Sequence, residues 1–187
     1  MRTDADGEFW NVLVGAIIGG AVGGLFEIGS QLASNNGSFK DLEWGAVVNK
    51  TMTGAALGAS TALGVTYLGQ AIAGTAAYSA GSVATAFGAS VGISATTGGV
   101  GYVTEKLIDK KRDEISASGI IGHSVVTGVE GAVSFGIGGM VGSMEPSIGK
   151  MGKVLKSKEW YSKFIISQEF SNSIKIPMDK LRKTLWR

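Results

Sequence analysis

Uncharged residues make up most of this chain and are grouped in long runs. The first run covers 18 residues, 9–26, and is broken by Glu27. Glycines recur at every fourth position in this run, at Gly15, Gly19 and Gly23. This spacing places them on one face of a helix. The turn-forming sequence Asn-Asn-Gly-Ser at 35–38 predicts that the helix ends near Ala33.

The longest uncharged run covers 54 residues, from Thr51 to Thr104. A helix needs about 20 residues to cross a bilayer, so this run is long enough for two crossings with a turn between them. The small and polar residues at 77–82 are the best position for that turn. We therefore expect two helices here, over 44–77 and 82–112.

Residues that favour helix N-termini stand before two of the expected helices. Ser38 or Asp41 can cap the second helix. Ser116 or Ser118 can cap a fourth helix, which we expect to run to about Val141.

Pro146 cannot continue a helix and restrains the residue before it, so it marks a domain boundary. Residues 1–145 form a Gly/Ala-rich hydrophobic helical region, and residues 146–187 form a basic amphipathic segment. The expected fold class is all-α. Four Gly/Ala-rich helices are arranged as two hairpins in a glycine-zipper-like bundle, and a basic C-terminal helical segment follows.

The four-residue spacing of small residues extends beyond the first helix. A Gly or Ala at every fourth position forms a groove that lets a neighbouring helix backbone approach closely. Each glycine inside a helix costs roughly 0.5–1 kcal/mol relative to Ala, so packing must offset their sum. We expect helix packing at Gly15, Gly19, Gly23, Gly54, Gly58, Gly88, Gly92, Gly128 and Gly136.

The composition is consistent with closely packed helices and excludes several chemistries. Gly accounts for 30 of 187 residues, charged residues for 17%, and the mean hydropathy is +0.23. The chain has no Cys and one His, which excludes disulfides and thiolate nucleophiles and argues against a metal centre. No glycine cluster has the spacing of a nucleotide-binding loop, so no cofactor is expected. The opening residues are acidic, and we expect no Sec-type signal in them.

Charge is distributed unevenly along the chain. Residues 150–187 contain ten Lys or Arg and three Asp or Glu, whereas residues 1–149 contain seven and twelve. The basic segment suits anionic lipid headgroups, and its aromatic residues Trp160, Tyr161 and Trp186 are expected at headgroup depth on a membrane. The alternative is an amphipathic helix that packs on the bundle. No nucleic-acid partner is expected.

The run without charges favours membrane association over a water-soluble bundle. A surface helix in water needs a polar face, and Ser and Thr alone form a weak one. Against insertion, Gly, Ala, Ser and Thr gain little from hydrocarbon, and Glu27 and Glu130 would each cost about 2.5–3.5 kcal/mol near a helix centre. A soluble bundle of closely packed small residues is therefore the alternative.

Three ionisable residues lie within the apolar helices. In a membrane such groups tend to face a bundle interior or a water path, so Glu27, His123 and Glu130 are candidates for pore-lining or pH-sensing groups. His123 and Glu130 are seven residues apart on one expected helix and would share a face. Such a pair could act as a general acid and base, but no nucleophile is placed near it, which makes a structural role more common.

Residues 4–11, Asp-Ala-Asp-Gly-Glu-Phe-Trp-Asn, and the Gly-rich sequence 14–24 resemble the segment after the conserved core of Rhs/YD-repeat polymorphic toxins. The resemblance covers residues 4–30 in sequence and 31–145 in composition. It implies a secreted antibacterial effector that is released from a parent Rhs shell and acts on a target cell. It also implies a cognate immunity protein as a partner.

The kind of toxin follows from what the chain contains after the Gly-rich region. About 40 residues are too few for an independent catalytic domain, so we expect no enzyme. The resemblance then favours a toxin that inserts its helices into the target-cell membrane and permeabilises it, with self-association as an option. The alternatives are an enzymatic toxin that uses His123 or residues 150–187, with the Gly-rich region assisting translocation, and a soluble packing module.

Overall fold

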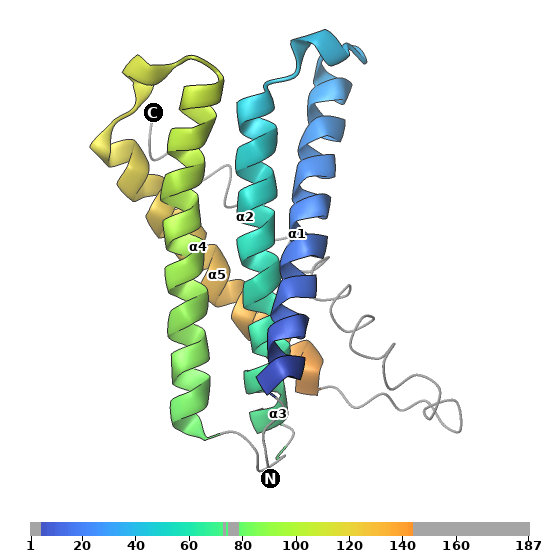
Figure 1. The fold of residues 1–187 in the computed structure, drawn as a ribbon, viewed down its shortest axis with the longest axis vertical. Helices are drawn as coiled ribbons and strands as arrows, with labels where there is room; N and C mark the ends of the chain where they lie inside the picture. Colours follow the sequence, from blue (N-terminus) through green and yellow to red (C-terminus); the bar gives the residue numbers. More distant parts are fainter. Residues whose placement is uncertain (1–4, 73, 75–78, 144–187) are drawn as a thin grey trace.

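The computed structural model describes residues 5–72, 74 and 79–143 (Figure 1). Its elements, in chain order, are α1 (Ala5–Ser34), η1 (Phe39–Asp41), α2 (Trp44–Leu63), η2 (Gly64–Leu68), α3 (Gly69–Ile72), α4 (Ala80–Ile108), η3 (Arg112–Glu114) and α5 (Ala117–Ser143). No strand occurs in these ranges, so the expected all-α class is confirmed. The boundary at residues 145 and 146 and the basic segment lie outside the described residues.

The turn predicted after the first helix is present. α1 ends at Ser34, and Asn36 and Gly37 follow with positive φ angles of 52° and 81°. The amide of Gly37 donates to the carbonyl of Leu32 over 2.8 Å. This bond reverses the chain at the end of the helix.

The helix caps agree with the sequence at α5 but not at α2. Ser116 Oγ accepts a hydrogen bond from Gly119 N over 3.0 Å and caps α5. Ser38 precedes η1 instead of α2, and Glu43 occupies the cap position of α2 without a side-chain bond. Asp109, at the end of α4, accepts from Gly45 N over 3.0 Å instead.

Two of the expected helix ranges differ from the structure. The helix expected over 44–77 is α-helical to Leu63, and η2 and α3 continue it to Ile72. The helix expected over 82–112 is α4, which ends at Ile108 because Lys110 adopts a left-handed conformation with a φ of 58°.

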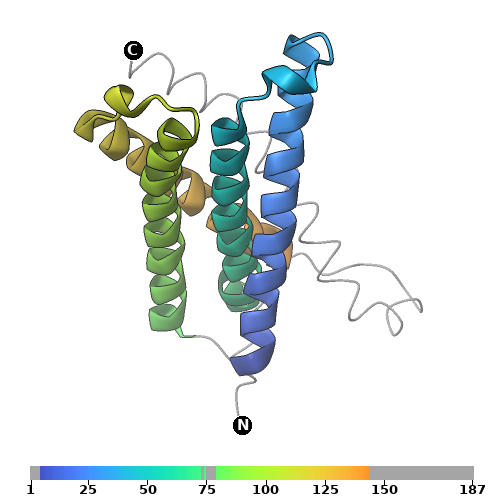
Figure 2. The same cartoon turned by 45° about the horizontal axis from the view of Figure 1, so that its top comes forward.

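α2 lies at the centre of the bundle and contacts α1, α4 and α5 (Figure 1). α5 crosses α2 and α4 obliquely, as the views in Figures 1 and 2 both show. The connections α1–α2 and α4–α5 lie at one end of the bundle. α1 packs on α2 and α4 on α5, and the contacts of α2 with α4 and α5 join these pairs into one bundle.

The π-helical turn η2 was not predicted from the sequence. It lies where α5 crosses the chain, and a Cβ at Gly64 would collide with the backbone of Phe135. One turn further on, a Cβ at Gly69 would lie 2.7 Å from Gly142 Cα. The crossing is therefore a contact between two backbones.

Candidate functional site: an apolar surface around buried hydroxyl groups

The outer surface of the bundle is rich in large apolar side chains. On α1, the side chains of Ile17, Leu25 and Phe26 are 62%, 69% and 67% exposed, whereas apolar side chains of this size are usually buried in a core. Similar residues face outward on the other helices: Phe87, Ile93 and Val100 on α4, and Ile121, Val125, Val129 and Met140 on α5. This surface extends along all three helices.

Three helices are long and apolar enough to cross a membrane. They cover Phe9–Ser34, Ala80–Ile108 and Ala117–Ser143, with 26, 29 and 27 residues. At 1.5 Å per residue each is about 40 Å long, which exceeds the roughly 30 Å of a hydrocarbon core. α2 is not among the three, and it has more buried positions than α4.

The interior of the bundle combines apolar residues, such as Val65, Phe135 and Ile137, with many small and polar ones. The largest fully buried side chains are Leu57, Thr61, Ser60, Ser90, Ser94 and Ser134, and all but one of them carry a hydroxyl group. Asn49, Thr66, Thr127 and Glu130 are also buried. The described bundle therefore buries several hydroxyl groups while it leaves many large apolar side chains on its surface, whereas an ordinary water-soluble domain buries most of its large apolar side chains.

Three serines meet where α2 and α4 pack together. Ser60 Oγ lies 3.1 Å from Ser94 Oγ and 3.3 Å from the carbonyl oxygen of Ser90. On the α5 side, a Cβ at Gly131 would lie 2.6 Å from Ser94 Cβ, so only glycine fits there. Ser90 Oγ is fully buried and has no hydrogen-bond partner. Thr66 Oγ1 in η2 is also buried without a hydrogen-bond partner.

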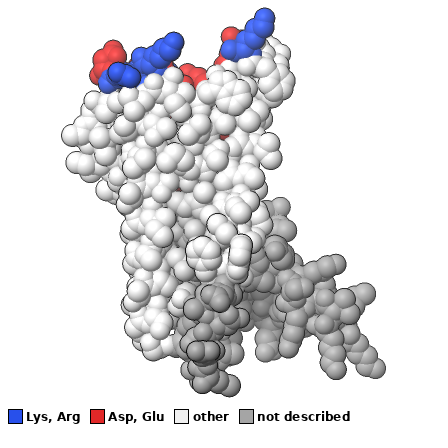
Figure 3. All heavy atoms as spheres, in the orientation of Figure 1, with Lys and Arg blue, Asp and Glu red and all other residues white. Residues whose placement is uncertain are grey.

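Charged side chains gather at one end of the bundle. Figure 3 shows that almost all the Lys, Arg, Asp and Glu side chains visible on this face lie at the end that holds the α1–α2 and α4–α5 connections. Lys111 Nζ lies 3.3 Å from Glu43 Oε1 and links the two connections. Asn49 Nδ2 donates to Glu105 Oε2, which links α2 to α4 at the same end.

Gly15, Gly19 and Gly23 of α1 lie against α2 with almost no space between the backbones. A Cβ at Gly15 would be 2.7 Å from the carbonyl oxygen of Gly58. At Gly19 it would collide with the carbonyl of Gly54, and at Gly23 with that of Lys50. The contact is reciprocal, because a Cβ at Gly54 or Gly58 would meet the carbonyl of Gly19 or Gly15.

The other glycines expected to pack helices behave differently. A Cβ at Gly128 on α5 would lie 3.2 Å from Ala95 Cβ, a close but looser contact. Gly88, Gly92 and Gly136 have no atom of a neighbouring described helix within 4 Å of the Cβ position. They share the spacing of the packed glycines but not their contacts. Gly88 and Gly92 are exposed on α4, and Gly136 lines an open groove between α4 and α5.

The structure also packs several glycines that the repeat spacing did not single out. Gly98 of α4 faces Thr127, and Gly101 faces Asn49 Oδ1. Gly138 of α5 faces the carbonyl of Thr61, and Gly142 faces Val65. The four-residue spacing of Gly138 and Gly142 was a usable signal.

The three ionisable candidates do not share one location. Glu27 lies on α1 and accepts a hydrogen bond from Gln31 Nε2 over 2.9 Å. His123 is half-buried on α5, with its ring centroid 4.5 Å from that of Tyr102. Only Glu130, also on α5, is buried in the interior.

The described part of the chain holds no group of three or more His, Asp or Glu side chains that could bind a metal ion. Trp160, Tyr161 and Trp186, expected at a membrane interface, lie outside the described residues.

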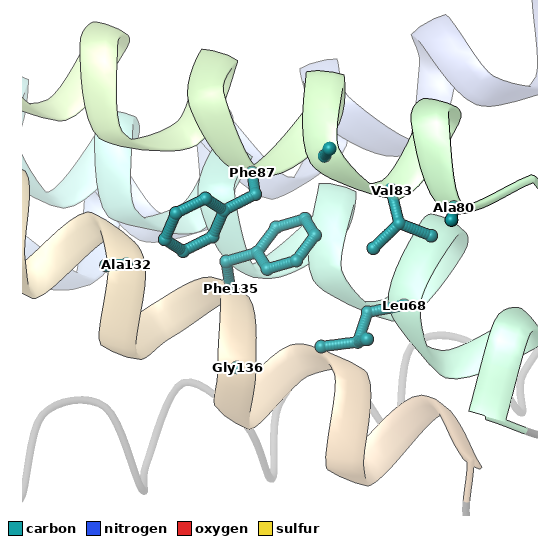
Figure 4. A pocket seen from close by; sticks show the side chains of 8 residues that line it. Leu68, Ala80, Val83, Phe87, Ala132, Phe135 and Gly136 are labelled. Carbon is teal, nitrogen blue, oxygen red and sulfur yellow. The ribbon is translucent and has the colours of Figure 1, made fainter.

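A shallow apolar groove lies between α4 and α5 (Figure 4). It holds about 470 Å³ and is lined mainly by Leu68, Val83, Phe87 and Phe135. The two phenylalanine rings meet edge to face, with centroids 5.6 Å apart. The groove has no polar side chain in its lining and is continuous with the apolar outer surface.

No family description, curated protein or solved structure matches this chain, so only its own residues indicate what it does.

Proposed function

We propose that the described helices, within residues 5–72 and 79–143, are embedded in a lipid bilayer. We propose further that the protein is an Rhs-type effector that permeabilises the membrane of a target cell without enzymatic turnover. The observation that carries this proposal is the apolar outer surface of the bundle. Large apolar side chains face outward on α1, α4 and α5, while several serine and threonine hydroxyls are buried between the helices.

This distribution is unfavourable in water. Each large apolar side chain left exposed forfeits about 1.5–3 kcal/mol of possible burial. In hydrocarbon the outward apolar side chains are solvated by lipid, and polar residues on the inside are the usual arrangement.

The packing between α1 and α2 also supports a location in the bilayer. Lipid supplies no hydrophobic drive for helices to associate, so membrane helices pair through close van der Waals contact at small residues. The reciprocal contacts of Gly15 with Gly58 and of Gly19 with Gly54 are of this kind. These contacts would stabilise the pair of helices inside a bilayer.

The toxic role rests on the resemblance of residues 4–30 to the segment after the core of Rhs toxins. In such a system the protein would be released from a parent shell and secreted. It would insert into the membrane of a neighbouring cell, alone or as a homo-oligomer. A cognate immunity protein would protect the producing cell.

Purified full-length protein added to vesicles tests the proposal. We expect loss of a preset membrane potential and release of an enclosed dye, with the protein recovered in the membrane fraction. Vesicles without protein are the control. Intact vesicles together with degraded DNA, RNA or NAD would contradict the proposal and favour an enzymatic toxin.

A further inference from the structure

We infer that the junction of α2, α4 and α5 is a hydrated path through the bundle that binds water and small cations. The inference rests on the proposed bilayer location and deepens it, because it places permeation inside one chain. It starts from the two buried hydroxyls without partners, Ser90 Oγ and Thr66 Oγ1.

The serine cluster at the middle of α4 needs water. Ser60 Oγ and Ser94 Oγ bond to each other over 3.1 Å, and Ser60 Oγ lies 3.3 Å from the Ser90 carbonyl. Ser90 Oγ is fully buried and is left without a partner. Buried polar groups in proteins are almost always satisfied, and a bound water is the usual partner where no protein group is available.

Polar groups continue from this cluster toward the charged end of the bundle. The inner face of α4 carries small or polar residues at successive turns, at Ser90, Ser94, Gly98, Gly101 and Glu105. Thr127 Oγ1 lies against Gly98, and Asn49 Oδ1 lies against Gly101. Asn49 Nδ2 then donates to Glu105, which lies at the end of the bundle where the charged side chains gather.

Toward the other end the path continues along α2 and η2. Thr61 is fully buried there, and Thr66 Oγ1 supplies the second hydroxyl without a partner. Thr66 lies in a π-helical turn, a local irregularity that is frequent at functional sites. The direct bond between Ser60 Oγ and Ser94 Oγ closes the path at this level. Passage requires these hydroxyls to exchange that bond for a bond to water or a small cation, which excludes large solutes.

The charge of the interior favours cations. Among the buried side chains of the described residues, Glu130 is the one with a formal charge. The adjacent residue on α5, Gly131, packs directly on Ser90 and Ser94, so Glu130 is buried at the same level of α5 as the serine cluster. An ionisable residue inside a membrane bundle commonly marks an ion pathway, and an acidic one selects for positive ions.

The absence of cysteine from the chain allows a direct test with single cysteines. Ser90→Cys places a thiol in the path, and Ile93→Cys places one on the outer face of the same helix, where the side chain is 45% exposed. The full chain is reconstituted in vesicles and treated with a charged, water-soluble methanethiosulfonate. We expect Ser90→Cys to react at least about tenfold faster than Ile93→Cys, because only a hydrated thiol forms the reactive thiolate. The reaction should also remove most of the cation flux.

The possible outcomes separate this inference from the proposed function. If both thiols are unreactive, the interior is dry and the inference is wrong, although the bundle is in the membrane. If Ile93→Cys reacts and Ser90→Cys does not, the outer face is in water and both ideas are wrong. Equal rapid reaction of both would show an open structure and overturn the inference. Should Ser90→Cys fail to enter the membrane fraction, Thr66→Cys gives the same test.

The role of Glu130 in ion selectivity is tested by measuring the reversal potential. Across a potassium chloride gradient we expect a reversal potential that indicates cation preference, and Glu130→Gln should move it toward zero. An unchanged reversal potential in Glu130→Gln would overturn the assignment of this carboxylate. Glu27→Gln is the matched control, because Glu27 lies on α1, away from the path, and accepts a bond from Gln31.

Discussion

At the level of single residues, glycines on one helix have opposite consequences for stability. Gly19 and Gly29 both lie within α1. A Cβ at Gly19 would collide with the carbonyl of Gly54, whereas nothing lies within 4 Å of the Cβ position at Gly29. The same residue type is thus a packing requirement at one position and a local weakness at the other.

Alanine substitution at these two glycines should change stability with opposite signs. Gly19→Ala should lower the free energy of unfolding by about 1–3 kcal/mol, because α1 and α2 must separate to admit the methyl group. Gly29→Ala, the matched control, should raise it by roughly 0.5–1 kcal/mol, the helix propensity difference. Unfolding in detergent micelles by increasing SDS, followed by circular dichroism, measures both. Equal effects at the two positions would show that α1 does not pack as described.

The repeat spacing predicted which residues share a helix face, but not what that face meets. Gly15, Gly19 and Gly23 were singled out on spacing, and the structure places them against α2. Gly88 and Gly92 have the same spacing, yet their face of α4 meets no other described helix. Spacing is a property of one helix, whereas contact depends on how helices are arranged, and no local pattern encodes that arrangement.

At the level of elements, the start of α2 depends on a residue from another helix. Asp109, 64 residues further along the chain, accepts the hydrogen bond of Gly45 N and replaces the cap expected from Ser38 or Asp41. The α-helical character of the long uncharged runs could be predicted from composition and spacing. The cap that Asp109 supplies to α2 could not be predicted, because Asp109 and Gly45 are 64 positions apart and no local pattern relates them.

Removing this distant cap should weaken the start of α2. We expect Asp109→Ala to lower stability by about 1 kcal/mol, within the range of 0.5–2 kcal/mol for a lost N-cap. Asp109→Asn keeps an acceptor oxygen and should retain most of the stability. Amide hydrogen exchange at Gly45 reports the effect locally and should be faster in Asp109→Ala alone. Unchanged exchange in that variant would mean that the bond does not stabilise the helix start.

At the level of the whole molecule, the outer surface and the charged end together define how the bundle would sit in a bilayer. The apolar surface follows α1, α4 and α5, and the visible charges gather at the end with the α1–α2 and α4–α5 connections (Figure 3). That end would lie at a water interface. The outer face between the two ends would lie in hydrocarbon.

An arginine on the outer face distinguishes lipid from water as the surrounding solvent. Ile17 is 62% exposed, so in water Ile17→Arg should change stability by no more than about 0.5 kcal/mol. In a bilayer the same change should cost about 2.5–3.5 kcal/mol and reduce the membrane-bound fraction. Ile17→Leu is the control and should partition as the wild-type protein does. Fractionation of cells expressing each variant gives the result, and full membrane recovery of Ile17→Arg would contradict a lipid-facing position.

The central position of α2 has a consequence for how the protein enters a membrane. α2 is not among the three helices apolar enough to cross alone, yet it is surrounded by them. Its polar groups, Asn49, Ser60 and Thr61, would meet hydrocarbon if α2 inserted first. Asn49 and Ser60 bond to α4, and Thr61 lies against Gly138 of α5, so pairing with α1 alone would leave these groups in hydrocarbon. In the proposed bilayer α2 would be covered only once α4 and α5 pack against it, so that the helices would enter as an assembled bundle instead of one at a time.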